Sequence, residues 1–336
     1  MTYSRRQTFR IGAGVVAAGV AMPWVARAQS TVKWDLSTVW PDSNFHTQNC
    51  KVFAEEVKKA TGGAVDITVK AGGQLGFKGP EHLRAVRDGL VPIADVLNVQ
   101  QVGDEPLLGI EGVPFLVGDF DELKILHKHV RPAFEAIATR NNQSILYMVP
   151  WPTQYLHLKI KAETVDALKG IKIRVPDKNS QDLTAAIGMA PALIPWGETI
   201  PALASGAVAG VSTSSVSGVD GKFWEFLKFF HRTNHQWSSQ IVNVNADAWK
   251  KLSPAHQTAI KETAAKLEPQ FWAVSQKADT DAAKRLVEGG MQMVTPPAAM
   301  MADMRQKTAT LLDAFMKRVS ASEKPIKGFL AEVKRA

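Results

Sequence analysis

The strongest constraint on the fold is an alternation between two hydrophobic periods that runs through most of the chain. Apolar residues recur at every second position at 65–69 and 171–175, which is typical of strands. Segments with helical spacing separate such strands, as at 44–63 and 119–142, the latter with a kink or split expected at Pro132. This order of elements predicts an α/β fold, with helices on both faces of parallel or mixed sheets.

The alternation occurs twice, which together with the length of 336 residues predicts two α/β lobes. The two runs meet near the prolines of 150–152. After Ser253 the pattern changes to a helical stretch of about 35 residues that is interrupted only by Pro269. At a rise of about 1.5 Å per residue such a helix would be about 50 Å long, which is enough to cross both lobes. Two shorter helices are expected around 298–319 and 323–335.

Residues 1–28 have the features of an export signal. Three arginines precede an apolar run, and Ala26 and Ala28 occupy the small-residue positions of a cleavage site. Arg5 and Arg6 favour the twin-arginine route, but the phenylalanine that usually follows lies one position late, so the Sec route stays open. A membrane anchor is the other alternative, although the run is short for a span. We expect a periplasmic protein that is cleaved near Ala28.

Charge, cysteine content and motifs exclude several functional classes. The formal net charge of +8 falls to +4 when the four arginines of 1–28 are removed, and no basic stripe indicates nucleic-acid binding. The single cysteine, Cys50, forms no intrachain disulfide and has the spacing of a core residue. The motifs GxSxG, HExxH, CxxC and the P-loop are absent from the sequence. His231 and His235 lack a full set of metal ligands, so we predict no metal and no cofactor.

Arg174 is the leading candidate for ligand binding. It lies near the end of the strand at 171–175, on the face opposite Ile173, and Pro176 follows that strand. Ligands of open α/β sheets bind outside the carboxyl ends of strands, and a guanidinium matches a carboxylate in a two-bond geometry. The alternative is a solvated strand face shared with Lys172.

Weaker candidates lie at the ends of other strands. Trp196 ends the next predicted strand, at 190–196, and offers a flat wall for an apolar ligand, although a core tryptophan is the alternative. Thr213 and Ser214 could face a cleft or belong to a polar loop. The remaining candidates are Trp40, Asn98, Trp151 and Gln154.

Several segments together resemble one known family. They include "FAEEVKKATGGAVDITV", "GGQLG", "AVRDGLVPIADV", "GVPFLVGDFDE", "ALASGAVAG" and "NADAWKKLSPAHQTAIKETA". The most specific is "LKGIKIRVP" followed by a G-x-x-P segment. On these segments the chain resembles the DctP-type periplasmic solute-binding subunit of TRAP transporters, over nearly the whole mature length.

The resemblance implies a two-lobe periplasmic binding protein fold, with mixed sheets flanked by helices and one long helix spanning both lobes. We expect lobe I to comprise 29–151 and about 239–278, and lobe II 152–238 and about 279–336. It also implies a small organic acid bound between the lobes, hinge motion, and delivery to a TRAP permease driven by an ion gradient. Such receptors mostly act as monomers.

The resemblance assigns the ligand carboxylate to Arg174 and an aromatic contact to Trp196. Members that take acidic sugars carry a second arginine on the first crossover strand, where Gln154 matches best in this chain. Many members read V-D-G-x-E where this chain reads "VAGVSTS" at 208–214. Both departures favour a small monocarboxylate with an apolar or aromatic body. We expect Trp40 and Trp151 to wall that body, and Gln154, Asn98, Thr213 and Ser214 to orient its polar groups.

Two alternatives to a transport receptor stay open at this point. An exported enzyme acting on a carboxylate would need a general base at the cleft, for which Glu198 and His46 are the candidates. A receptor could instead serve as the ligand-sensing partner of a membrane kinase.

Overall fold

The computed structural model describes residues 31–335. The predicted export signal at 1–28, with its cleavage site, lies outside the described residues. Within 31–335, no helix combines the length and apolar character needed to span a membrane.

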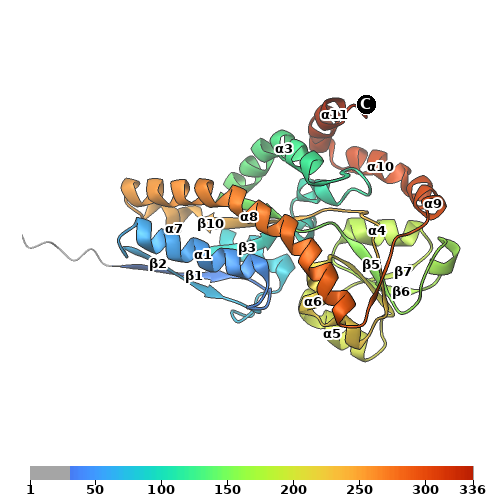
Figure 1. Cartoon of the computed structure of the whole chain (residues 1–336). Coiled ribbons are helices and arrows are strands. Elements are labelled where there is room, and N and C mark those ends of the chain that lie inside the picture. Colours follow the sequence, from blue (N-terminus) through green and yellow to red (C-terminus); the bar gives the residue numbers. More distant parts are fainter. Residues whose placement is uncertain (1–30, 336) are drawn as a thin grey trace, which may run out of the picture. The chain divides into compact units, whose positions relative to one another are not determined.

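The first of two sheets is mixed and has five strands (Figure 1). Its order is β2 (Val65–Lys70), β1 (Val32–Ser37), β3 (Ile93–Leu97), β10 (Ser239–Asn245) and β4 (Gln143–Pro150). β1 is parallel to β2 and β3, whereas β10 is antiparallel to both of its neighbours, β3 and β4. β10, which lies between β3 and β4 in the sheet, therefore begins about 90 residues after the end of β4.

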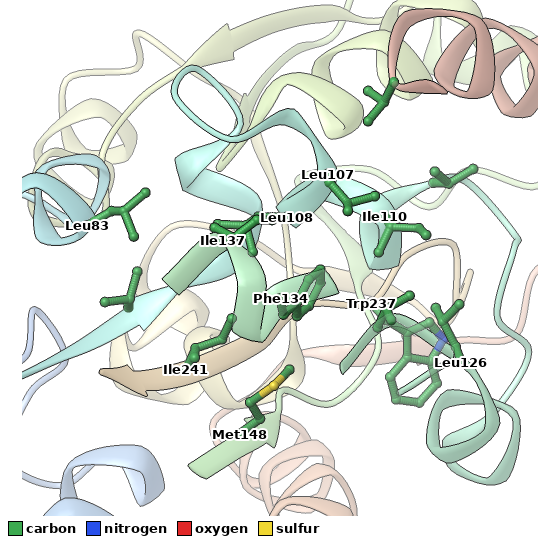
Figure 2. Close-up of a cluster of buried hydrophobic side chains, with 14 of the residues drawn as sticks. Leu83, Leu107, Leu108, Ile110, Leu126, Phe134, Ile137, Met148, Trp237 and Ile241 are labelled. Carbon is green, nitrogen blue, oxygen red and sulfur yellow. The ribbon is translucent and has the colours of Figure 1, made fainter. Parts of the chain in front are cut away.

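Two hydrophobic clusters accompany this sheet. In one, α1 (Phe45–Ala60) buries Phe53 and the single cysteine, Cys50, against the strands, as expected for a core cysteine. The other is drawn in Figure 2, where Leu83, Phe134 and Ile241 come together from α2 (His82–Arg87), α3 (Phe120–Arg140) and β10. The short helix α7 (Ala246–Lys250) follows β10 directly.

α3 shows why a proline inside a helical pattern need not end a helix. Asp119 caps its first turn by accepting hydrogen bonds from the backbone amides of Asp121 and Glu122, at 3.0 and 2.9 Å. The helix is not split at Pro132, because it continues to Arg140, and a kink at this residue stays a prediction. A proline removes only one backbone donor, and the buried apolar face of α3 on both sides of it supplies the compensating energy.

The second sheet is also mixed and has six strands. Its order is β11 (Gln292–Val294), β9 (Phe229–His231), β5 (Tyr155–Leu158), β8 (Gly210–Thr213), β6 (Lys172–Val175) and β7 (Ala190–Leu193). β6 is parallel to β7 and β8, and β5 is antiparallel to β8 and β9. The accompanying helices are α4 (Lys178–Ala186), α5 (Trp196–Ala204), α6 (Ser215–Asp220) and α9 (Ala298–Thr308).

The long helix predicted after Ser253 is confirmed as α8 (Pro254–Glu288), 35 residues that include Pro269 (Figure 1). It contacts α1 and strand β4 of the first sheet, and α6 and strand β11 of the second. Phe271 joins the cluster of the first sheet and Leu286 a cluster of the second. A two-lobe α/β fold with mixed sheets, flanking helices and one long helix is therefore confirmed.

The chain ends in α10 (Thr310–Arg318) and α11 (Glu323–Glu332). Phe315 and Phe329, one from each helix, belong to the same cluster as Phe134 of α3. The range 279–336, which we expected to form part of lobe II, thus contributes its last two helices to the core beside the first sheet.

Candidate ligand-binding site

Arg174 is buried, although it shares a strand face with an exposed lysine. Lys172 is exposed, whereas Arg174 is only 2% exposed, so the alternative of a solvated face holds for Lys172 alone. The Nε of Arg174 donates a hydrogen bond to the Ile194 carbonyl at 2.8 Å. Burial lowers the pKa of Arg174 to about 10, although the nearby negative charge of Asp177 acts to raise it. The guanidinium therefore stays charged at neutral pH.

Arg174 faces a cavity of about 20 Å³, hereafter the Arg174 cavity. Its wall comes from the carboxyl ends of β6 and β8 in the second sheet, from the end of β3 in the first, and from the two segments that connect the sheets. The predicted residues that line it are Arg174, Trp196, Gln154, Thr213, Ser214, Trp40 and Trp151. The structure thus brings seven of the eight predicted site residues together.

Three tryptophans form one side of the Arg174 cavity. The ring centroids of Trp40 and Trp151 lie 4.5 Å apart and those of Trp40 and Trp196 lie 5.6 Å apart. Within residues 31–335, the buried indole Nε1 atoms of Trp40 and Trp151 have no hydrogen-bond acceptor. This wall therefore offers an apolar surface to a bound molecule, and its two indole N–H donors are buried.

Trp196 reaches the cavity from a different element than predicted. β7 ends at Leu193, and Trp196 is the first residue of α5 rather than the last residue of a strand. Pro195 precedes it with a φ of −57° and occupies the N-cap position, and the predicted strand "APALIPW" extends three residues past Leu193, the last paired residue of β7.

Asn98 is the predicted residue that does not line the cavity. Its Oδ1 accepts hydrogen bonds from the backbone amides of Val99, at 2.7 Å, and Ser239, at 3.1 Å. Asn98 thereby ties the end of β3 to β10, while its Nδ2 is buried and has no hydrogen-bond acceptor within residues 31–335.

Sequence reasoning missed several polar residues of the cavity wall, notably Asp177, Ser180 and Gln236. The Ser180 hydroxyl lies 2.7 Å from Asp177 Oδ2 and 3.0 Å from Gln236 Oε1, and the Ser180 amide donates to Asp177 Oδ1 at 3.0 Å. Burial raises the pKa of Asp177. Asp177 could have been found from its position after "RVP" and before a helix, where aspartate is a common N-cap.

The two residues weighed as general bases both lie outside the Arg174 cavity. Glu198 forms an exposed ion pair with Lys78 at 2.8 Å. His46 is buried beside Trp151, with ring centroids 4.5 Å apart, and burial lowers its pKa well below the ordinary value. Among residues 31–335, no group of three or more His, Cys, Asp or Glu side chains has a geometry that could hold a metal ion.

Residues 36–318 match the family described as bacterial extracellular solute-binding protein, family 7, also called DctP. This chain belongs to that family. As a DctP-family protein it is structurally similar to DctP6 of Bordetella pertussis, an extracytoplasmic solute receptor that binds pyroglutamic acid. The TM-score is 0.86 at 28% identity, covering 89% of this chain and 99% of that one.

Two further similar proteins are named for the ligand that they bind. A marine metagenome TRAP solute-binding protein specific for pyroglutamate has a TM-score of 0.85 at 26% identity, covering 91% of this chain and all of that one. A monocarboxylate 2-oxoacid-binding periplasmic protein of Nostoc is 24% identical over 275 residues, which is 78% of this chain and 73% of that protein. The resemblance to TRAP transporter receptors is confirmed.

Proposed function

We propose that this protein is a periplasmic TRAP receptor that captures a small monocarboxylate with an apolar or aromatic body between its two lobes. It would then deliver the acid to a membrane permease driven by an ion gradient. The observation that carries the proposal is Arg174, a charged and buried side chain that reaches a cavity walled by tryptophans. The relatives that bind pyroglutamate or 2-oxoacids support a carboxylate ligand.

A single carboxylate fits the charges of the cavity wall. Among residues 31–335, Arg174 is the one cationic side chain in the lining, and Gln154 is neutral. Asp177 contributes negative charge to the same wall and would oppose a second ligand carboxylate. Micromolar binding, about −8 kcal/mol, suits a scavenging receptor.

The roles of the lining residues follow from their chemistry. Arg174 pairs with the carboxylate, and Trp40, Trp151 and Trp196 contact the ligand body. Gln154, Thr213 and Ser214 orient polar groups of the ligand. Asn98 is left out of this assignment because both hydrogen bonds to its oxygen are internal.

The competing functions find less support in the site. An exported enzyme would need a base near the bound acid. Within residues 31–335, Asp177 in the cavity lining already accepts hydrogen bonds from Ser180 on both oxygens, and Glu198 lies outside this lining and is paired with Lys78. We further propose cleavage near Ala28, a monomeric receptor that binds no nucleic acid, and chain crossings between lobes near 151, 238 and 278, with α10 and α11 returning to pack beside the first sheet. Mass spectrometry of the exported protein checks the cleavage site, and light scattering checks the monomeric state.

The proposed function is tested with Arg174→Ala and a library of small carboxylates. Thermal unfolding of the wild type should identify acids that raise its melting temperature. In Arg174→Ala that rise should disappear, while circular dichroism shows a folded protein. Binding by Arg174→Ala within threefold of the wild type would refute the carboxylate assignment, and chemical turnover of a bound acid would refute the receptor assignment.

A further inference from the structure

A second cavity adjoins the Arg174 cavity. Trp196 and Gln100 line both of them, so these two side chains form the boundary. The second cavity, hereafter the tail cavity, has a volume of about 160 Å³. Val39, Phe77, Pro195 and Trp196 make most of its wall apolar, and Lys78 and Glu198, which form an exposed ion pair with each other, also line it.

The two volumes suit different parts of one molecule. The Arg174 cavity, at about 20 Å³, holds little more than one water-sized group, since a water needs about 10–15 Å³ measured in this way. A carboxylate group is close to that limit, and the rest of an acid exceeds it. The tail cavity, at about 160 Å³, resembles apolar cavities of about 150 Å³ that hold benzene.

Resting on the proposed function, we propose that the ligand is an arylalkanoic acid or an equally bulky apolar acid. Its carboxylate meets Arg174, and its benzene-sized group passes Trp196 into the tail cavity. Compact acids, which lack that group, leave the tail cavity unused and bind more weakly, because apolar surface removed from water stabilises the complex in proportion to its area.

Gln100 adds a polar contact at the boundary. Its Oε1 is buried and has no hydrogen-bond donor within residues 31–335. A Cβ built on Gly79 would lie 2.1 Å from this oxygen, so Gly79 gives Gln100 the space for this position. The oxygen is covered by protein atoms, so a ligand hydroxyl would reach it only after the Gln100 amide turns toward the cavity. 2-Hydroxy arylalkanoic acids are therefore one member of the proposed class.

Lactate and 3-phenyllactate test this assignment, since they share the 2-hydroxy acid group and differ by one phenyl ring. The wild type should bind phenyllactate at least about tenfold more tightly than lactate by calorimetry, because of the apolar area buried in the tail cavity. Gly197→Leu should reduce that ratio to about one and leave lactate binding within threefold. Gly197 lines the tail cavity, and a Cβ added there meets no atom within 4 Å, so a leucine fits at this position without a backbone clash.

Gly103→Leu is the matched control. Gly103 is exposed, its Cβ position is equally open, and it lies outside both cavities, so this variant should keep the wild-type ratio. Val39→Phe fills the tail cavity from the first lobe and replaces Gly197→Leu if that variant fails to fold.

Equal affinities of the wild type for the two acids would overturn the tail-cavity proposal, and so would an unchanged ratio in Gly197→Leu. Neither result affects the proposed function if other carboxylates bind and Arg174→Ala abolishes their binding. Conversely, unchanged binding of both acids by Arg174→Ala would refute the proposed function.

Discussion

Replacing Arg174 by methionine should change stability and binding in opposite directions. Arg174 is 2% exposed, and its one protein hydrogen bond runs from Nε to the Ile194 carbonyl at 2.8 Å. Methionine is similar in length and carries no charge, so it fills the same space without a desolvated cation. The ligand-free protein should gain stability, while carboxylate binding is lost.

The magnitude follows from the cost of burying the guanidinium. Burial lowers the pKa of Arg174 from 12.5 to about 10, which corresponds to about 3 kcal/mol at 1.36 kcal/mol per pKa unit. Losing the hydrogen bond to the Ile194 carbonyl costs about 1 kcal/mol. The net expectation is a gain of about 2 kcal/mol in the free energy of unfolding, or a few degrees in melting temperature.

Binding should fall by about a hundredfold or more in the same variant. Removing one partner of a buried charge pair costs about 2–5 kcal/mol, because the ligand carboxylate is left desolvated without its cation. Urea unfolding measures the stability of the ligand-free protein, and calorimetry with the tightest acid of the library measures binding. Arg84→Met is the control, since Arg84 forms an exposed ion pair with Asp104 and should change both quantities little.

Two results would refute this reasoning. A loss of more than about 2 kcal/mol in the ligand-free Arg174→Met protein would mean that the guanidinium stabilises the fold instead of costing energy. Retained acid binding in a folded Arg174→Met protein would mean that the carboxylate lies elsewhere.

Two further substitutions probe the tryptophan wall and a buried acid. Trp196→Ala should weaken binding of aromatic acids more than that of compact acids in calorimetry, and an equal loss for all acids would make Trp196 structural. Burial raises the pKa of Asp95, which is 1% exposed in β3, to about 7. Because its pKa is higher in the folded protein than in the unfolded chain, Asp95 lowers stability progressively as pH rises from about 4 to about 7. In urea unfolding, the stability of Asp95→Asn relative to the wild type should therefore be higher at pH 8 than at pH 4. A difference between the two proteins that does not change with pH would contradict this.

The order of elements could be predicted from the sequence because hydrophobic period is a local property. The strand at β2 and the long helix α8 follow directly from the spacing of their apolar residues. Strand partners could not be predicted in this way, because β10 carries no local mark of its position between β3 and β4. The packing of Phe315 and Phe329 beside the first sheet is likewise a tertiary result.

The residues of the candidate site could likewise be predicted only in part. Arg174 could be chosen because a polar residue at the end of a strand has a defined place in an α/β sheet. Asn98 also follows a strand, but its oxygen accepts backbone hydrogen bonds from Val99 and Ser239, and the second of these partners is distant in sequence. Gln236 and Ser180 reach the cavity from a connecting segment and a helix, where no periodicity identifies them.

The position of β10 has a consequence for how the chain acquires its structure. The first sheet has β3 and β4 separated by a strand that begins at Ser239. Until that residue has been synthesised, β3 and β4 each lack a hydrogen-bonded neighbour, and exposed strand edges tend to pair with other chains. Contacts of such long sequence separation also slow folding, since the intervening loop must close first. We therefore expect the first sheet to be completed only after Ser239 has been synthesised, later than in a protein built from sequential strands.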